Sequence, residues 1–467
     1  MKLLTRGTVF SFLLASVTVT SAQMTSVTVS EIAQETPERL TSIAGQSVAN
    51  AQHVFLDQQG TLHLVTQDSH FVREEDGSWQ RIGESKFPTA SQVLTVGPDQ
   101  FLLATNDGII KWSGDRSQPA GLNGKKVNSI SRASDGRLAA ATDVGLFESK
   151  DGLSWDSVQI LDSVGRQWAA RDVRAVVYDA QDQLWVGQLA GLACRTKEDW
   201  RFYEGRDGLP YADFTCAATG ADSKVWFGTR IGVVGYENGR WLYRQGPRFL
   251  PGDEVRSIAV TSDGTPWIAT DGGLACLKRT QMTLAEKARF YERQIDQFIK
   301  RTPYGYTSEV QLKAPGDLSE IRYSDSDNDG LWTAMYGASQ CFAVAVTGSE
   351  EHKAAAKKAF DAIRFLQTVT QGGSHSPPKG YIARTILPTD GHNPNDGRLE
   401  SDRRMRERGD RMWKLYEPRW PTSADGKWYW KSDTSSDELD GHYFFLPLYY
   451  DLVADTEVER ERVREVV

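Results

Sequence analysis

The segment Gln183–Leu192, with the sequence QLWVGQLAGL, consists of a short apolar strand, a tight turn and a Gly-Leu pair. The same pattern recurs, with decreasing fidelity, at Lys224–Val233, Thr265–Leu274, Gln100–Ile109, Arg137–Leu146 and Thr61–His70. The glycine of the turn, replaced by serine at position 69, recurs at intervals of 37 to 46 residues. A repeat of about forty residues made of short strands predicts a β-propeller with one blade per copy. Six copies favour six blades, with seven as the alternative.

Two residue types explain why this segment can build a blade. The glycine suits the turn between the second and third strands of a blade, because that turn needs a positive φ angle. Trp185, Trp226 and Trp267 recur at one position of three successive copies. We expect these rings to fill the wedge between neighbouring sheets as core residues.

The link between copies also has a characteristic sequence. Residues Gly205–Pro210 read GRDGLP and precede a predicted inner strand at 213–218. This link, together with the tryptophan-containing motif, resembles the two-component regulator propeller repeat over about residues 45–280. The resemblance implies the repeat type and an exported sensor or ligand-binding propeller. It does not imply an activity, because propellers support unrelated functions.

The first 22 residues have the features of a secretory signal peptide. Lys2 and Arg6 provide a positive start, Val9–Val17 is a short apolar run, and small residues precede Gln23. The apolar run is too short for a typical membrane span. We therefore expect an exported protein, periplasmic or extracellular, without a membrane span after cleavage. An uncleaved N-terminal anchor is the alternative.

Charge and cysteine content narrow the choice of partners. The chain has 467 residues and a formal net charge of −8, which argues against nucleic acid and anionic membranes as main partners. Glycans and other small-molecule ligands stay open, and some of the 14 tryptophans could stack on sugars. The sequence does not indicate the oligomeric state.

The cysteines at 194, 216, 276 and 341 lack metal-ligand spacing, so we expect buried, mostly unpaired thiols, with one disulfide as the alternative.

The strand pattern stops near Thr283, where a helical pattern begins. Thr283 and Glu286 have the spacing of a capping box, and apolar residues follow at helical intervals to position 299. A hairpin or extended connection is expected at 307–323. The helices predicted after it are 331–346, 350–370, 403–416, 441–453 and 457–467.

The predicted fold class is therefore multidomain β + α, with an N-terminal β-propeller and a C-terminal α-helical module. The module resembles an α/α toroid at the level of fold. A complete toroid has more helices, so we expect either an incomplete toroid or a shorter helical module. The expected parts are a signal peptide (1–22), an N-terminal extension (23–44), the propeller (45–281), a linker helix and connection (282–323) and the helical module (324–467).

Residues 324–330, SDSDNDG, copy the first half of a calcium-binding loop. The twelfth position of such a loop would be Tyr336 instead of a glutamate, so this is not a complete EF-hand. Alternating carboxylates repel one another unless a cation or a helix N-terminus neutralises them. The interpretations are a helix cap, a Ca²⁺ site, and a catalytic or substrate-binding loop. The candidate metal ligands are Asp325, Asp327 and Asp329.

The stretch Lys427–Tyr443 combines acidic, aromatic and histidine residues before a predicted helix. Glu438 and His442 would share a face of that helix, as a general acid–base pair requires. A capping box that joins Ser435 or Ser436 to Glu438, with a solvated first turn, is the alternative. The candidate catalytic residues are Asp437, Glu438, Asp440, His442 and Tyr443. The candidate substrate-binding residues are Arg384, Trp428, Trp430 and Asp433.

Arg384 is the one basic residue within the strand-like run 380–388. An arginine in such a run usually pairs with a carboxylate, or it could bind a substrate carboxylate in a bidentate manner. The rings of Trp428 and Trp430 alternate along a predicted extended strand, where one face could meet a sugar.

Two functional hypotheses follow. The first is a secreted carbohydrate-active enzyme, a polysaccharide lyase or glycoside hydrolase, with its site in the helical module. In a lyase, Arg384 or a cation would neutralise a uronate carboxylate, and His442 or Tyr443 would remove the proton. In a hydrolase, two carboxylates such as Asp327 and Asp437 would act as acid and base. The second is a non-catalytic exported propeller that senses or binds a ligand. A single cavity lined by these residues would favour the enzyme, and separate helix caps would favour the binding protein.

Overall fold

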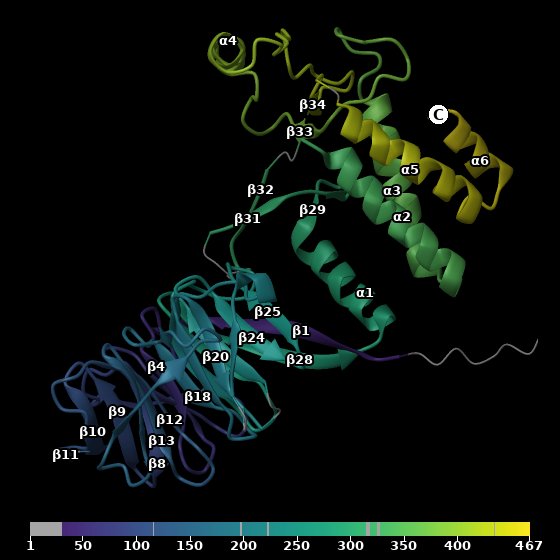
Figure 1. The fold of residues 1–467 in the computed structure, drawn as a ribbon. Coiled ribbons are helices and arrows are strands. Elements are labelled where there is room, and N and C mark those ends of the chain that lie inside the picture. Colours follow the sequence, from purple (N-terminus) through teal and green to yellow (C-terminus); the bar gives the residue numbers. More distant parts are fainter. Residues whose placement is uncertain are drawn as a thin grey trace, which may run out of the picture.

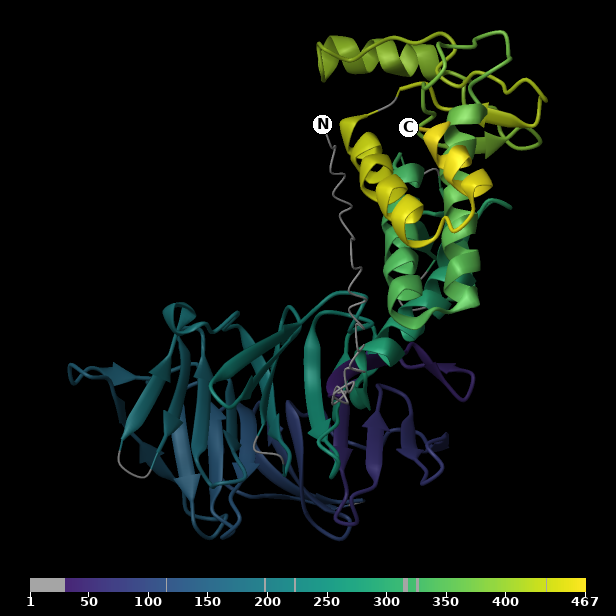
Figure 2. The same cartoon turned by 90° about the vertical axis from the view of Figure 1, so that its right-hand side faces the viewer.

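The computed structural model describes residues 30–114, 116–196, 199–221, 224–313, 318–324, 327–433 and 435–467. The expected signal peptide and Asp325 lie outside the described residues. The described chain forms a six-bladed β-propeller followed by a helical region with six α-helices, which confirms the predicted fold class. The helical region lies to one side of the propeller, and α1 joins the two parts (Figures 1 and 2).

Each blade is an antiparallel sheet of four strands. The innermost strands are β4 (His53–Leu56), β8 (Gln92–Gly97), β12 (Val127–Arg132), β18 (Ala175–Tyr178), β22 (Phe214–Thr219) and β26 (Val255–Val260). The second strands are β5 (Leu62–Val65), β9 (Gln100–Thr105), β13 (Leu138–Thr142), β19 (Leu184–Gln188), β23 (Val225–Thr229) and β27 (Pro266–Thr270). The third strands are β6 (His70–Arg73), β10 (Gly108–Ser113), β14 (Gly145–Ser149), β20 (Gly191–Arg195), β24 (Val233–Glu237) and β28 (Gly273–Met282). The outermost strands are β7 (Trp79–Gly83), β11 (Arg116–Pro119), β15 (Asp156–Val158), β21 (Trp200–Tyr203), β25 (Arg240–Arg244) and β1 (Ile32–Leu40).

The repeated segment forms the second and third strands of each blade, as predicted. Gly191 has a φ of +133°, and a Cβ atom there would collide with the carbonyl oxygen of Tyr203 on the outer strand. Glycine is needed at this position because both the backbone angle and the close approach exclude a side chain. Trp185, Trp226 and Trp267 are at most 4% exposed, which confirms that they pack in the core.

The ring closes because the first strand pairs with the last. β1 runs antiparallel to β28, in a register that extends from Ile32 opposite Met282 to Leu40 opposite Leu274. Residues 32–40, predicted to lie in an N-terminal extension, are therefore the outer strand of the sixth blade. Their sequence, IAQETPERL, lacks the repeat motif and has the charges and proline of an edge strand, so the repeat pattern does not include it.

Strand packing leaves a central cavity of 410 Å³ between the inner strands. The four cysteines are buried and unpaired, as expected. Cys194 and Cys276 occupy matching places on β20 and β28, in the fourth and sixth blades.

The described chain also has five short two-stranded ladders outside the blades. They are β2 (Ser42–Ile43) with β3 (Gln46–Ser47), β16 (Ile160–Leu161) with β17 (Gln167–Trp168), β29 (Lys300–Arg301) with β30 (Tyr306–Thr307), β31 (Val310–Leu312) with β32 (Ile321–Tyr323), and β33 (Ile386–Pro388) with β34 (Trp428–Trp430).

The helical region begins at the predicted capping box. The hydroxyl of Thr283 accepts a hydrogen bond from the Glu286 backbone at 3.2 Å, and the Glu286 carboxylate accepts one from the Thr283 backbone at 2.7 Å. α1 (Leu284–Gln294) starts there and continues into a π-helical turn at Ile295–Ile299. The later helices are α2 (Asp329–Thr347), α3 (Glu350–Thr368), α4 (Arg398–Arg408), α5 (Ser436–Leu452) and α6 (Glu457–Arg464).

α2 and α3 form a hairpin, and α5 packs alongside α2 around Phe360, Phe445 and Tyr449. The helix predicted at 403–416 is wrong in its bounds, because α4 ends at Arg408 and the chain then turns back. This turn lets the Trp413 indole donate a hydrogen bond to the Asp402 carboxylate at 3.2 Å. Among the described helices, none is long and apolar enough to cross a bilayer.

The turn glycine gives a direct test of the blade geometry. We expect Gly191→Ala to lower the free energy of unfolding by at least about 2 kcal/mol, because it combines a positive φ with a steric clash. Gly205→Ala is the matched control, since Gly205 has no heavy atom within 4 Å of an added Cβ and no positive φ. Urea denaturation followed by tryptophan fluorescence measures both. Equal stability of the two variants would contradict the assigned turn.

Candidate functional site

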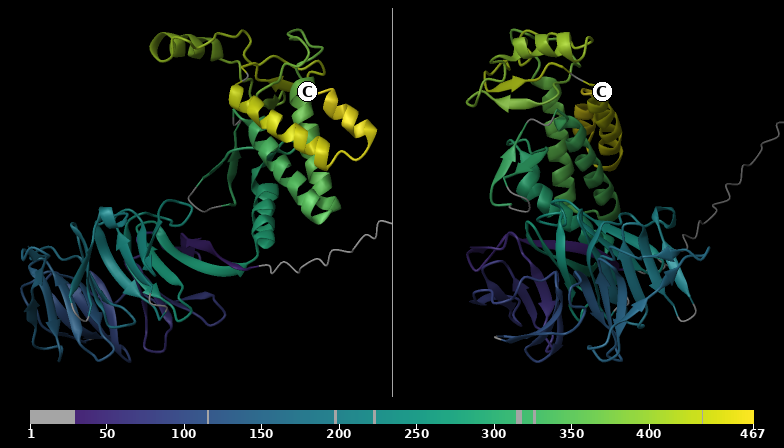
Figure 3. Two further views of the ribbon diagram at one scale, coloured as in Figure 1. Left: turned by 45° about the vertical axis from the view of Figure 1, so that its right-hand side comes forward. Right: turned by 60° about the vertical axis from the view of Figure 1, so that its left-hand side comes forward.

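α2 and α5 begin at the same end of the helical region, and their close packing requires glycine on both helices. A Cβ on Gly330 would overlap the carboxylate of Glu438, and one on Gly441 would lie 2.7 Å from the Cα of Leu331. The loops that precede the two helices therefore meet. These loops, α4 and the β33–β34 ladder lie at the end of the helical region that is far from the propeller (Figures 2 and 3).

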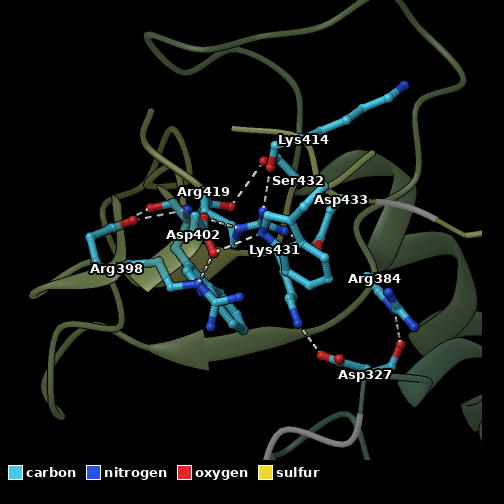
Figure 4. A network of polar contacts seen from close by, with 12 residues as sticks. Asp327, Arg384, Arg398, Asp402, Lys414, Arg419, Lys431, Ser432 and Asp433 are labelled. Carbon is cyan, nitrogen blue, oxygen red and sulfur yellow. Dashed lines mark hydrogen bonds and ion pairs between the residues drawn. The ribbon is translucent and has the colours of Figure 1, made fainter. Parts of the chain in front are cut away.

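The predicted Asp327 and Arg384 come together at this end, with Lys431 as a third member. The Lys431 ammonium forms an ion pair with the Asp327 carboxylate, and the Arg384 guanidinium donates a hydrogen bond to the Asp327 carbonyl oxygen (Figure 4). Asp327 is exposed and Lys431 is buried. The carboxylate of Asp327 is thus neutralised by Lys431, and Arg384 contacts the acidic loop through a backbone carbonyl oxygen instead of the expected carboxylate. Its role in binding a substrate carboxylate stays a prediction.

A second ion-pair network centres on the buried guanidinium of Arg419. Arg419 donates to the Asp402 carboxylate at 2.7 Å and also pairs with the predicted substrate-binding Asp433 (Figure 4). Arg398 pairs with Asp402 at 3.0 Å. Arg419 and Asp402 are each only 2% exposed. The charges of Asp402 and Asp433 are compensated by Arg419 and Arg398. We therefore expect this network to hold the loops together rather than to bind a charged ligand.

Beneath these networks, Asp329 is completely buried. Its carboxylate pairs with Arg301 and accepts a hydrogen bond from Thr385. Burial raises the pKa of Asp329 to about 6, against the opposing effect of the Arg301 charge. Asp329 thus lies in a different environment from Asp327, although the two are only two residues apart. Among the described residues, no group of three or more His, Cys, Asp or Glu side chains is arranged to hold a metal. Since Asp325 lies outside the described residues, the Ca²⁺ site stays a prediction.

Glu438 and His442 are neighbours in the interior at the start of α5. Nε2 of His442 lies 3.8 Å from Oε1 of Glu438, and the two side chains are at most 3% exposed. The other oxygen of Glu438 accepts a hydrogen bond from the Leu331 backbone at 3.0 Å. Glu438 therefore caps the neighbouring helix α2, and the predicted capping box with Ser435 does not form. A proton-transfer role for this pair stays a prediction, and its burial separates it from solvent.

The other predicted catalytic residues face outward. Asp437, Asp440 and Tyr443 are exposed on α5. A hydrogen bond from Ser435 lowers the pKa of Asp437, which keeps its carboxylate charged. The structure thus places these three on the surface and the Glu438–His442 pair in the core, so the five residues do not line one cavity.

The two predicted substrate-binding tryptophans have different surroundings. Trp430 is 3% exposed and packs in a core with Ile386 and Tyr381. Trp428 is half-buried and lines a cavity of 640 Å³ beside β33 and β34. Trp430 lies inside this cluster, and Trp428 packs against its edge with part of its surface open to the cavity.

Several residues of this region are not among the predicted site residues. These residues, which hold the charged loops in place, are Lys431, Arg419, Asp402 and Arg301. Lys431 lies within the stretch 427–443 that the sequence singles out, and the other three lie outside it. Arg398 and Asp402 are four residues apart in a charged helix, and this spacing in the sequence is compatible with their ion pair. The remaining contacts join residues that are distant in the sequence.

Comparison with known proteins finds a likeness to several solved structures over about half of the chain. No family model matches the sequence, and no curated protein matches it significantly. Solved structures share part of the fold: virginiamycin B lyase from Staphylococcus aureus is 12% identical, with a TM-score of 0.37 and coverage of 54% of this chain and 100% of the other. An extracellular domain of a hybrid two component system from B. thetaiotaomicron is 14% identical, with a TM-score of 0.37 and coverage of 52% and 40%. A gluconolactonase from Xanthomonas campestris is 14% identical, with a TM-score of 0.36 and coverage of 50% and 87%. These values are too low to support an inference about ligand or activity.

The Arg419 network predicts a large loss of stability when its centre is removed. We expect Arg419→Met to lower the free energy of unfolding by about 3–5 kcal/mol, because it leaves the buried Asp402 without its main partner. Arg404→Met is the matched control, since Arg404 is 59% exposed and lies 4.0 Å from Glu400; its expected effect is below about 1 kcal/mol. Chemical denaturation measures both. A similar loss in the two variants would show that the network is not a stabilising centre.

The raised pKa of Asp329 predicts a pH dependence of stability. Between about pH 4 and about pH 6 the folded state holds more protons at Asp329 than the unfolded chain, because its folded pKa exceeds 3.8. The contribution of Asp329 to stability therefore falls as the pH rises through this window. We expect the stability advantage of the wild type over Asp329→Asn to be larger at about pH 4 than at about pH 7. Urea titrations at several pH values measure this difference, and a difference that does not change with pH would refute the assignment.

Proposed function

We propose that this protein is an exported carbohydrate-binding protein whose glycan site is the cavity beside Trp428. The observation that supports this proposal is the composition of the cavity wall. The half-buried Trp428 lines it together with Lys427 and Asp390, which are exposed. Sugars combine an apolar ring face with hydroxyl groups, so an indole ring next to charged hydrogen-bonding groups matches their chemistry.

The position of Trp428 is determined by strand pairing and by aromatic contacts. Trp428 lies opposite Pro388 in the β33–β34 ladder. Its ring centroid is 5.8 Å from that of Tyr304 and 6.2 Å from that of Phe365. These contacts orient the indole before any ligand arrives, which reduces the entropy lost on binding.

Binding is favoured over catalysis because some of the predicted reactive groups are already paired or enclosed, and the exposed ones, Asp437, Asp440 and Tyr443, do not line the Trp428 cavity. Asp327 and Asp433 are neutralised by Lys431 and Arg419. Glu438 and His442 are buried. A glycosidase needs two carboxyl groups at the scissile bond, and neither of these pairs meets the surface of the Trp428 cavity. The signal-peptide pattern of the first 22 residues supports export.

The proposal is tested with a panel of neutral and uronate oligosaccharides, screened on an array and then titrated by calorimetry. We expect at least one oligosaccharide to bind the wild type and Trp428→Ala to weaken that binding at least about tenfold, because the stacking ring is lost. Trp332→Ala is the matched control, since Trp332 is 40% exposed on α2 and lies outside the cavity. Equal affinity of Trp428→Ala and the wild type, or no binding by the folded wild type, would refute the proposal.

A lyase or hydrolase is the second candidate, because Asp327, Arg384 and Asp437 gather where α2 and α5 begin. The hydrogen bond from Ser435, and to a lesser extent the charge of Arg384, lowers the pKa of Asp437. Incubation of the same oligosaccharides with the protein and Ca²⁺, followed by mass spectrometry of the products, tests this candidate. Cleavage that is lost in Arg384→Gln would favour it over simple binding.

A further inference from the structure

A larger hollow lies between the first two blades of the propeller, apart from the helical region. Its volume is 920 Å³, and residues of β6, β7, β9 and β10 contribute to its walls. Strands β9 and β10 lie on the side of the propeller that is far from the helices (Figure 1). This cleft is therefore separate from the cavity beside Trp428.

One wall of the cleft is aromatic. Phe87, Phe101 and Trp112 all line it. The ring centroids of Phe87 and Trp112 are 4.3 Å apart, and those of Phe87 and Phe101 are 5.5 Å apart. Phe101 and Trp112 are each 8% exposed, so the protein holds both rings firmly. Such a wall suits a planar, mostly apolar ligand.

Two histidines that are hydrogen-bonded to each other line the cleft beside these rings, and the ring centroid of His70 lies 5.6 Å from that of Phe87. Nδ1 of His63 lies 2.9 Å from Nε2 of His70, and Nε2 of His63 lies 3.4 Å from Oδ2 of Asp57. The second oxygen of Asp57 accepts hydrogen bonds from the backbone of Gln59 and Thr61 at 2.9 and 2.8 Å. The carboxylate is thus held in place, and it starts a chain that runs from Asp57 through His63 to His70.

This chain determines which nitrogen of His70 is left to accept a hydrogen bond. In the neutral form of His63 that the proposal requires, Nε2–H donates to Asp57 and Nδ1 is an acceptor. Nε2–H of His70 then donates to that acceptor, and Nδ1 of His70 keeps a lone pair. Burial, and next the nearby His63, lowers the pKa of His70 to about 4, so this ring is neutral near pH 7. Among the described residues, no protein group is hydrogen-bonded to Nδ1 of His70.

We propose that this cleft binds a planar ring compound that bears one hydroxyl or N–H donor, and that Nδ1 of His70 accepts the hydrogen bond from that donor. The aromatic wall contacts the ring, and the His63–Asp57 pair orients His70. A metal would need further ligands, since most zinc sites have three or four from the protein, and no group of three or more candidate ligands is present in the described part of the chain. This site is independent of the proposed glycan site.

The test uses 2-naphthol as the probe and 2-methoxynaphthalene as its counterpart without a donor. Binding to the full-length protein near pH 7 is measured by saturation-transfer NMR. The ¹⁵N resonances of labelled histidine are followed in parallel, because the chain has only seven histidines. We expect 2-naphthol to bind at least about tenfold more tightly than 2-methoxynaphthalene and to shift the Nδ1 resonance of His70.

Variants separate the hydrogen bond from the apolar contact. His70→Phe keeps a ring beside Phe87 but removes the acceptor, so 2-naphthol should bind at least about tenfold more weakly. His375→Phe is the matched control in an exposed loop and should bind like the wild type. Equal binding of both probes, unchanged binding in folded His70→Phe, or no binding to the wild type would overturn the proposal. Tight binding of Zn²⁺ that shifts the ¹⁵N resonances of both His63 and His70 would overturn it in favour of a metal site.

Discussion

The antiparallel pairing of β1 with β28 is the constraint on which the propeller depends. Nine residues from the start of the described chain lie against the last repeat, so the sixth blade combines two segments about 240 residues apart in the sequence. This pairing satisfies the backbone groups of β28 and brings β4 against β26, which completes the ring of inner strands. The wedge-filling tryptophans can then be shielded on both sides, and the cleft between the first two blades acquires a defined shape.

A second constraint, the close approach of α2 and α5 through Gly330 and Gly441, organises the helical region. Two helix N-termini that begin side by side attract carboxylates, and burial then requires each carboxylate to have a partner. Arg301 is the partner of the buried Asp329, while Lys431 pairs with the exposed Asp327 and Arg419 pairs with the partly buried Asp433. The carboxylates of the acidic segments thus form ion pairs that join the loops to the helices.

The two ligand-sized hollows share one physical feature. In each, strand pairing holds aromatic rings in place before a ligand arrives: the β33–β34 ladder orients Trp428, and the second blade orients Phe101 and Trp112. They differ in their polar groups, since charged residues line the cavity beside Trp428 while two imidazoles hydrogen-bonded to each other line the propeller cleft. The ligands proposed for the two places differ in chemistry for this reason.

The sequence by itself determined the repeat, the core role of the tryptophans and the start of α1, because these depend on local spacing and on turn geometry. It favoured six blades over seven, and the pairing of β1 with β28 in the tertiary structure decided that number. The sequence also located the charged loops that converge near α2 and α5. It did not predict which basic residues neutralise the carboxylates of these loops. Lys431 with Asp327, and Arg419 with Asp433, are paired only by tertiary contact. His63 and His70 come together across the β5–β6 ladder, in which His63 lies opposite Val72 and His70 opposite Val65. Only the tertiary structure decided these pairs and the closing strand, because the energy of a charge, a hydrogen bond or an edge strand depends on its neighbours in space.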